Sequence, residues 1–330
     1  MIDARLTIAL SGDALALPDD GRIVAFEPPR GSDLPGLDRD RLLVVQDSKL
    51  DFDDFSARGF DCATQAEGSF ATAVVCLPRA RREAQALLAR AFELTDGPVI
   101  VDGQKTDGID AMLRQVRRRA RVEGPISKAH GKLFWLPSGT GDRFADWAAG
   151  PELSSGGFWT APGVFSADGI DPASAMLADA LPEKLGPEVA DLGAGWGFLS
   201  AHVLTRDSVR RVHLVEAGHM ALQCAQHNLT DPRAVFHWAD ATRWQAPERI
   251  DTVVMNPPFH TDRAADPRLG QAFVAAAARI LAPQGQLWMV ANRHLPYEST
   301  LKDHFAMVAE AGGDSRFKLL QAARPVRRRG

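Results

Sequence analysis

A glycine-rich motif, Asp191-Leu-Gly-Ala-Gly-Trp-Gly197, follows a short apolar segment and precedes a segment with helical character. Glycines at such a junction let the backbone turn tightly and approach a ligand closely, and a helix that begins there presents free N–H groups. Glu216 ends the next expected strand, where a carboxylate can accept hydrogen bonds from both hydroxyls of a ribose. This pattern indicates a nucleoside-containing cofactor. A tight turn with a surface acid and a dinucleotide oxidoreductase site are the alternatives, although the latter spaces its glycines as GxGxxG.

A second motif, Asn256-Pro-Pro-Phe-His260, follows the apolar segment 251–255. Its prolines fix φ and stiffen the loop, so the amide oxygen of Asn256 and the carbonyl of Pro257 can converge on a planar –NH2 group. Hydrogen bonds accepted from both N–H groups favour the pyramidal, nucleophilic form of the amine. Catalysis of this kind rests on positioning and electrostatics. Phe259 offers a face on which a base can stack. The alternative is a stiff loop without chemistry.

Strand and helix patterns alternate around both motifs, which predicts a parallel, doubly wound sheet with helices on both faces. Both motifs then follow the carboxyl ends of strands, where such sheets bind ligands. We expect strands at 188–192, 211–216, 234–238, 251–255, 286–292 and 317–322, and helices at 196–205, 218–229, 267–281 and 297–311.

The N-terminal half repeats this alternation more faintly. We expect strands at 41–46, 70–77 and 98–102 and helices at 79–94 and 107–121. Segment 73–78 aligns with 252–257, and the elements after it come in the same order, so we infer an internal duplication. The alternative is that any two α/β domains look alike at this level. The Gly/Pro/Ser-rich stretch 150–163 marks the boundary, giving domains at 1–150 and 151–330.

Composition places the chain among ordinary globular proteins, with 330 residues, 45% hydrophobic and 24% charged. Its length predicts two domains. Cys62, Cys76 and Cys224 form neither a disulfide framework nor a metal-ligand pattern, so we expect no metal. The sequence shows no long apolar run and no signal peptide, so we expect a cytoplasmic protein without a membrane partner.

Charge is distributed unevenly along the chain. The net charge of −4 excludes a wholly basic nucleic-acid binder but not a local basic patch. Residues 1–67 hold 14 acidic and 7 basic side chains, whereas residues 114–132 hold 7 basic and 1 acidic. The basic run predicts RNA contacts, with a solvated helix face as the alternative, and its candidates are Arg114, Arg117, Arg118 and Arg121. The arginine-rich end at 327–330 is a further candidate.

The glycine motif, followed by Glu216 and then Asp240, resembles the S-adenosylmethionine site of class I methyltransferases. That resemblance implies that Asp191 lies near the methionine end, that Glu216 holds the ribose and that Asp240 faces the adenine amino group. The cofactor-binding residues that it implies are Asp191, Gly193, Ala194, Gly195, Gly197, Glu216, Asp240 and Asn256.

The second motif resembles that of the amino-methyltransferases that modify exocyclic amines of adenine or guanine, or the glutamine amide. Three flanking segments, at 131–135, 158–171 and 291–297, narrow the resemblance to the bacterial ribosomal RNA guanine-N2 methyltransferases of the small-subunit methyltransferase C type. It is strongest over about 155–325 and weaker over about 70–136. The family implies two tandem Rossmann-like class I methyltransferase domains with mostly parallel doubly wound sheets, of which the first is degenerate and helps to recognise RNA and stabilise the second.

This resemblance implies S-adenosylmethionine-dependent methylation of the N2 amine of a guanine in ribosomal RNA, with 16S rRNA or the small ribosomal subunit as partner. The catalytic residues would be Asn256, Pro257, Pro258 and Phe259, with Phe165 and His260 as further substrate contacts. A duplicated chain can substitute for a dimer, so we expect a monomer. The alternatives are an amino-methyltransferase acting on a 23S rRNA guanine, a DNA adenine or a protein glutamine, and a non-catalytic RNA-binding assembly factor.

The first domain carries signs of degeneracy in its own residues. After the expected strand 41–46, the chain continues Asp47-Ser-Lys-Leu without a glycine motif, and Leu77 stands at the position aligned with Asn256. Leu77 cannot accept a hydrogen bond. We therefore expect the first domain neither to bind the cofactor nor to methylate.

Overall fold

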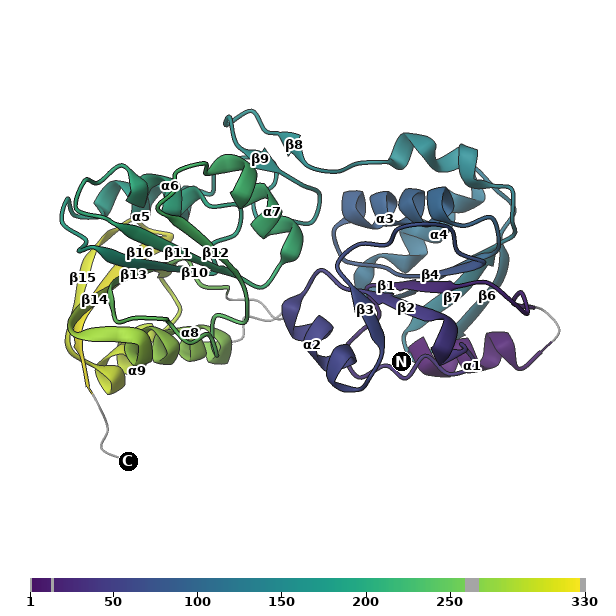
Figure 1. Ribbon diagram of the computed structural model, residues 1–330, viewed down its shortest axis with the longest axis horizontal. Helices are drawn as coiled ribbons and strands as arrows, with labels where there is room; N and C mark the ends of the chain where they lie inside the picture. The colour runs from purple at the N-terminus through teal and green to yellow at the C-terminus, as the bar shows by residue number, and fades with distance from the viewer. Residues whose placement is uncertain (1, 13–14, 259–266, 327–330) are drawn as a thin grey trace. The chain divides into compact units, whose positions relative to one another are not determined.

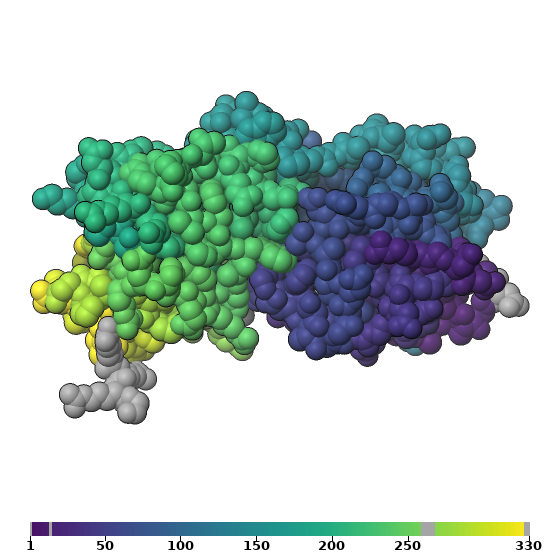
Figure 2. All heavy atoms as spheres, in the orientation of Figure 1, coloured from purple at the N-terminus to yellow at the C-terminus, as the bar shows by residue number. Residues whose placement is uncertain are grey.

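The computed structural model describes residues 2–12, 15–258 and 267–326 (Figure 1). Contacts divide the chain into two compact units, residues 1–151 with 161–163 and residues 152–160 with 164–330. In the space-filling view the first unit runs from purple to teal and the second from teal through green to yellow (Figure 2). The chain therefore passes between the units near residues 151–164.

The first unit is built on one mixed sheet. From β3 to β5 neighbouring strands are parallel, and β7 and β6 then follow as antiparallel strands. In spatial order the strands are β3 (Asp61–Ala63), β2 (Leu42–Val45), β1 (Ile23–Phe26), β4 (Thr72–Cys76), β5 (Val99–Gln104), β7 (Gly131–Leu136) and β6 (Glu123–Lys128).

The sheet of the second unit has the same order and the same strand directions. In spatial order its strands are β12 (Ala234–Trp238), β11 (Arg211–Glu216), β10 (Glu188–Leu192), β13 (Ile250–Met255), β14 (Leu281–Asn292), β16 (Phe317–Pro325) and β15 (Phe305–Gly313). The expected fold of two tandem Rossmann-like sheets is confirmed. The shared strand order is what an internal duplication predicts.

Helices cover both faces of each sheet, because each sheet buries apolar side chains on both sides. None of the described helices is long and apolar enough to cross a membrane. In the first unit, α1 (Ile2–Leu10) and α2 (Lys49–Ala57) pack on one face, and α3 (Arg81–Leu94), α4 (Ile109–Arg117) and η3 (Gly141–Trp147) pack on the other. In the second unit, α5 (Pro172–Ala180), α6 (Phe198–Leu204) and α7 (His219–Asn228) cover one face, and α8 (Pro267–Ile280) and α9 (Tyr297–His304) cover the other (Figure 1). Shorter elements are η1 (Arg39–Arg41), η2 (Lys105–Asp107), β8 (Glu152–Leu153) and β9 (Trp159–Thr160).

One expected helix was wrong in its second half. The segment 297–311 forms α9 only as far as His304, and the chain then continues as β15, antiparallel to β16. Residues 305–311, Phe-Ala-Met-Val-Ala-Glu-Ala, contain good helix formers, but pairing with β16 overrides that local preference. The sequence patterns also failed to reveal β1, a strand of only four residues that are all buried.

Candidate functional site

The glycine motif forms the turn between β10 and α6. The backbone N–H groups of Gly193 and Ala194 donate to the carbonyl of Val215 at 2.9 and 3.2 Å, which holds the turn against the end of β11. Gly193, Gly195 and Gly197 have φ values of 76°, 55° and 91°, the left-handed region that favours glycine. A Cβ at Gly197 would also lie 3.0 Å from Leu229, so this glycine is needed for packing at the start of α6.

Asp191 lies beneath this turn and is fully buried. Its Oδ2 accepts a hydrogen bond from Ser200 Oγ at 2.7 Å, and Oδ1 has no partner among the described residues. Burial raises the pKa of the Asp191 carboxyl to about 7, although the bond from Ser200 opposes this. In the structure Asp191 supports the turn from below, and its expected contact with the methionine end of a cofactor stays a prediction.

Two acids stand at the ends of the neighbouring strands. Glu216, at the end of β11, accepts from the N–H of Gly195 at 2.8 Å and from the N–H of Gly218 at 2.7 Å. Asp240 follows β12 and accepts from the N–H and the hydroxyl of Thr242 at 2.8 and 2.6 Å. The two acids are brought to the same edge of the sheet, because Ala239 N–H donates to the Glu216 carbonyl at 2.9 Å. Their carboxylates can accept hydrogen bonds from the hydroxyls and the amino group of a nucleoside.

A pocket opens over the glycine turn. Segment 165–171 lies beside it, and the indole N–H of Trp196 ties this segment to the turn by donating to the Phe165 carbonyl at 3.0 Å. Phe165 is 57% exposed, which leaves an aromatic residue available at the pocket. The pocket is lined by Phe165, Ser166, Asp171, Ser174, Gly193, Ala194, Gly195, Trp196, Phe198, Leu199 and Asn256.

Asn256 enters the same pocket from the end of β13. Its Nδ2 donates to Asp171 Oδ2 at 3.0 Å and lies 2.9 Å from Ser174 Oγ. Both partners belong to the start of α5: Asp171 caps this helix by accepting from Ser174 N–H at 2.8 Å. The amide nitrogen of Asn256 therefore faces α5, and its carbonyl oxygen Oδ1 faces away from Asp171.

The predicted site residues of the second unit gather at one sheet edge as far as they are described. Gly193, Ala194, Gly195, Asn256 and Phe165 line the pocket, Glu216 ends β11, and Asp240 follows β12. Pro257 and Pro258 follow directly in the chain, whereas Phe259 and His260 lie outside the described residues, as do residues 327–330.

Sequence reasoning missed Asp171 and Ser174 as partners of Asn256. Asp171 precedes Pro172, and an Asp followed by Pro at the first helical position is a recognised helix start. That signal predicts α5, but no local pattern could have predicted a bond across 85 residues to Asn256.

The corresponding edge of the first unit differs, and two details of the expected alignment were wrong. The counterpart of β10 is β1 rather than the strand at 41–46, because Glu27 N–H donates to the Val45 carbonyl just as Gly193 N–H donates to Val215. Ala25 pairs with Val74 as Asp191 pairs with Val254. Cys76 lies two residues after Val74, and Asn256 lies two residues after Val254. Cys76 therefore matches Asn256, and the expected match with Leu77 was wrong. A buried thiol at this position still offers no amide.

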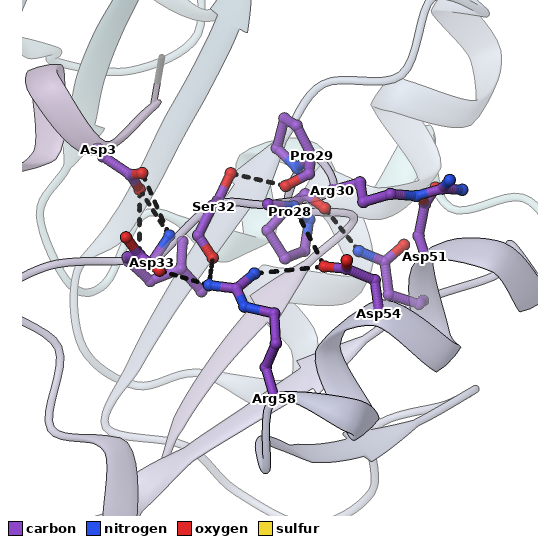
Figure 3. Close-up of polar contacts among 12 residues, drawn as sticks. Asp3, Pro28, Pro29, Arg30, Ser32, Asp33, Asp51, Asp54 and Arg58 are labelled. Atoms are coloured by element: carbon purple, nitrogen blue, oxygen red, sulfur yellow. Dashed lines mark hydrogen bonds and ion pairs between the residues drawn. The ribbon is translucent and has the colours of Figure 1, made fainter.

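The loop after β1 is held by the chain's own side chains (Figure 3). Arg58, which follows α2, donates to the Ser32 carbonyl at 2.9 Å and pairs with Asp33. Gly31 N–H donates to Asp54, and Asp3 of α1 accepts from the N–H groups of Asp33 and Leu34. Glu27 stands where the second unit has Gly193, so this edge carries a side chain in place of the glycine turn.

Glu27 gives this edge a measurable signature. Burial, and next the charge of Asp47, raises the pKa of the Glu27 carboxyl to about 8. The folded chain thus keeps a proton that the unfolded chain releases from about pH 4.5, so stability falls as pH rises from 4.5 to 8. We expect Glu27→Gln to stabilise the first unit at pH 9 by up to about 4 kcal/mol and hardly at pH 4. Denaturant unfolding at both pH values measures this, with exposed Glu67→Gln as control. Equal effects at both pH values would contradict it.

The basic run lies on the first unit. Arg114 and Arg117 occupy the last turns of α4, Arg118 ends it and Arg121 follows, and all four are exposed. Arg121 lies 3.4 Å from Glu123. No carboxylate in the part of the chain that the structure describes lies within ion-pair distance of the other three. Their apolar neighbours Met112, Leu113 and Val116 are buried on the other side of the helix.

One group of described residues brings potential metal ligands together, at the opposite, amino end of the strands. Ligand atoms of Glu188, His213 and Glu248 all lie within 4.8 Å of one another. Arg211 already supplies a positive charge, since it pairs with Glu248 and lies 3.9 Å from Glu188. We assign no metal role to this group.

The family model described as "Methyltransferase small domain" matches residues 155–321, which contain the glycine turn, the two strand-end acids and Asn256. The chain belongs to this methyltransferase family. The match covers the whole sheet of the second unit as far as β16 and begins near the start of that unit. The expected relation to the ribosomal RNA methyltransferases of the C type is confirmed by the following relatives.

Relatives of this methyltransferase include proteins that match nearly its full length. "Ribosomal RNA small subunit methyltransferase C" of Alteromonas mediterranea is 24% identical over 93% of this chain and 96% of its own length. "Ribosomal RNA large subunit methyltransferase G" of Aeromonas salmonicida is 34% identical, but over only 48% of this chain and 44% of its own. The solved structure of the T. thermophilus 16S rRNA N2 G1207 methyltransferase, in complex with AdoMet and guanosine, covers 98% of this chain and 92% of its own, with a TM-score of 0.75 and 25% identity.

Proposed function

We propose that this methyltransferase uses S-adenosylmethionine to methylate the exocyclic N2 amine of a guanine in ribosomal RNA, with 16S rRNA as the substrate. The observation that carries the proposal is the orientation of Asn256, whose carbonyl oxygen is turned away from α5 at the pocket over the glycine turn. A fixed acceptor there suits an –NH2 group. The relatives named for rRNA methylation, one of them solved with guanosine, support guanine as the base that carries this –NH2 group.

The residues present fit the cofactor S-adenosylmethionine. Glu216 and Asp240 would receive the ribose hydroxyls and the adenine amino group, and the open space at Gly195, where a Cβ would meet no atom within 4 Å, admits the cofactor beside the turn. Asp191 Oδ1 is a buried acceptor without a described partner, which suits a nearby ammonium group. The cofactor supplies a methyl group on a sulfonium sulfur, an electrophile that needs no further activation.

The protein's part is to prepare the amine. Asn256 Oδ1 accepts a hydrogen bond from one N–H of the amine and the Pro257 carbonyl accepts one from the other, which favours a pyramidal nitrogen whose lone pair is localised on the nitrogen and no longer delocalised into the ring. The exposed face of Phe165 would provide stacking for a base taken out of its helix, and Phe259 is proposed as a second stacking contact. Transfer of the methyl group would break the C–S bond, leave a neutral thioether and give a cationic nitrogen, which can release its proton to solvent. No strong base is required, and His260 is a proposed contact only.

The first unit is proposed to bind RNA through Arg114, Arg117, Arg118 and Arg121. Three of them face solvent without an ion-pair partner among the described residues, so their charge is available to phosphates. The loss of the glycine turn and of the Asn256 equivalent in this unit supports a role in recognition instead of catalysis. A monomer in the cytoplasm, where ribosomal RNA is found, is the setting that we propose.

Replacing Arg114, Arg117 and Arg118 with alanine should weaken binding of 16S rRNA by about 10- to 100-fold at moderate salt. The slope of log K against log salt should become shallower by about two to three, because roughly one counterion is released per phosphate contact. Filter binding over a salt series measures both. Arg90→Ala, which removes an arginine already paired with Glu93, is the matched control. Unchanged affinity and slope would assign these arginines to an ordinary solvated helix face.

The function is tested by incubating the purified protein with S-adenosylmethionine labelled in its methyl group and with small ribosomal subunits, naked 16S rRNA or 23S rRNA from a strain lacking the enzyme. We expect label in 16S rRNA, released by nuclease and recovered as N2-methylguanosine by mass spectrometry. Label in 23S rRNA, in DNA or in protein would redirect the proposal to another amine. Cofactor binding without transfer to any of them would overturn it.

A further inference from the structure

The contact between Asn256 and the start of α5 has a consequence for catalysis. Asp171 is a carboxylate and can only accept hydrogen bonds when ionised. It already accepts from Ser174 N–H at 2.8 Å, and the group that it takes from Asn256 at 3.0 Å must therefore be the –NH2. An Asn side chain by itself can turn either end toward a substrate. Beside Asp171 it cannot.

We propose that Asp171 is the positioning residue that fixes the amide of Asn256 with its carbonyl oxygen toward the acceptor amine, and that Ser174 assists it. The two residues act through Asn256. The proposal rests on the proposed function, in which Asn256 accepts a hydrogen bond from the substrate amine. It assigns to Asp171 the selection of a hydrogen-bond donor at this site. An amide turned the other way would present –NH2 to an amine, leaving two donors face to face.

The surroundings of these groups support a fixed geometry. Ser174 is buried, at 7% exposure, and its Oγ lies 2.9 Å from Asn256 Nδ2 as a second partner for the same –NH2. Asp171 is anchored because it caps α5, with Pro172 at the first helical position. Segment 165–171 is in turn tied to the glycine turn through Trp196. The orientation of the Asn256 amide is thus fixed by contacts with the start of α5, which is itself connected to the glycine turn.

The test separates positioning from helix capping. Asn is as good a helix cap as Asp, so Asp171→Asn should leave the melting temperature within about 2 °C. It presents both an oxygen and an –NH2 to Asn256, and the amide can then flip. We expect kcat to fall by about 10- to 100-fold, with the Kd for S-adenosylmethionine and the KM for the RNA within about threefold. Ser174→Ala should give a smaller fall of about threefold to tenfold.

Asp179→Asn, the same substitution on the exposed side of α5, is the matched control and should match the wild type. In the Asn256→Ala background, Asp171→Asn should cause no further loss, because the amide that it orients is gone. Wild-type kcat in Asp171→Asn would overturn the proposal. So would a tenfold weaker cofactor affinity with unchanged kcat, which would make Asp171 a cofactor contact. A wild-type protein that methylates an amine other than rRNA guanine overturns the proposed substrate alone, since the same comparison can be made on that amine.

Discussion

Asn256→Ala is expected to reduce methyl transfer on the order of 10³-fold. It removes the acceptor that we place against the reacting amine, and groups of this kind are worth about 10²–10³ in rate because they act where charge changes in the transition state. Oδ1 has no substitute on the alanine side chain, and a water at the site is mobile and not preorganised. The Kd for S-adenosylmethionine should change by less than about tenfold, since Glu216 and the glycine turn are untouched. Single-turnover kinetics and calorimetry measure the two quantities separately.

Asn292→Ala is the matched control, because Asn292 ends β14, the strand beside β13, and carries the same side chain. Its effect should be far smaller. Asn256→Asp is a sharper variant: it is nearly isosteric, yet it sets a carboxylate against Asp171, so it should be impaired as well. Activity within threefold of the wild type in Asn256→Ala would refute the mechanism, provided that the melting temperature shows a folded protein.

Glu216→Ala is expected to weaken S-adenosylmethionine binding by about 100-fold. Two hydrogen bonds between a carboxylate and ribose hydroxyls contribute about 1.5–3 kcal/mol each. The net binding free energy is smaller, because the Glu216 carboxylate already accepts from Gly195 and Gly218 in the free protein. The substitution also loosens the glycine turn. Calorimetry with S-adenosylmethionine measures the loss directly, and kcat at saturating cofactor should stay within about fivefold.

Glu216→Gln is the graded control, because it keeps the shape and one acceptor and should lose only about tenfold. Asp240→Ala should also lose less than Glu216→Ala, since Asp240 is committed to Thr242 and is proposed to meet a single amino group. A Kd for Glu216→Ala equal to that of the wild type would remove Glu216 from the cofactor site and leave it only as a brace for the turn.

Much of the second unit is predictable because its elements follow one another with clear local signals. The glycine turn, the apolar run 251–255 and the proline loop each mark the end of a strand, and parallel strands bring those ends to one edge. The partners of Asn256 were not predictable: Asp171 and Ser174 have the pattern of an ordinary helix start, and only the folded sheet brings them to residue 256. Residues 305–311 contain good helix formers, and their antiparallel pairing with β16, which follows after residues 314–316 alone, overrides that local preference.

In the first unit, the equivalent residues are hard to align from sequence because the glycine motif is absent. No glycine turn marks β1, so the sequence pattern predicts the strand at 41–46 but not the four-residue strand that precedes it. Leu77 and Cys76 are neighbours that point to opposite faces of the sheet, so an error of one residue exchanged a core position for a site position. The hydrogen-bond register of the folded strands is what resolves such a shift.

The strand order of the second sheet limits how early this sheet can fold while the chain is being synthesised. β16 is the last strand among the described residues, yet it lies inside the sheet, between β14 and β15. While the ribosome is still adding residues 317–325, β15 has no edge to join and the buried apolar side chains of β14 lack one neighbour. The first unit has its interior strand β7 complete by residue 136. A nascent chain can thus complete the sheet of its first unit about 190 residues before that of its second, so the first unit can fold while the second still lacks an interior strand.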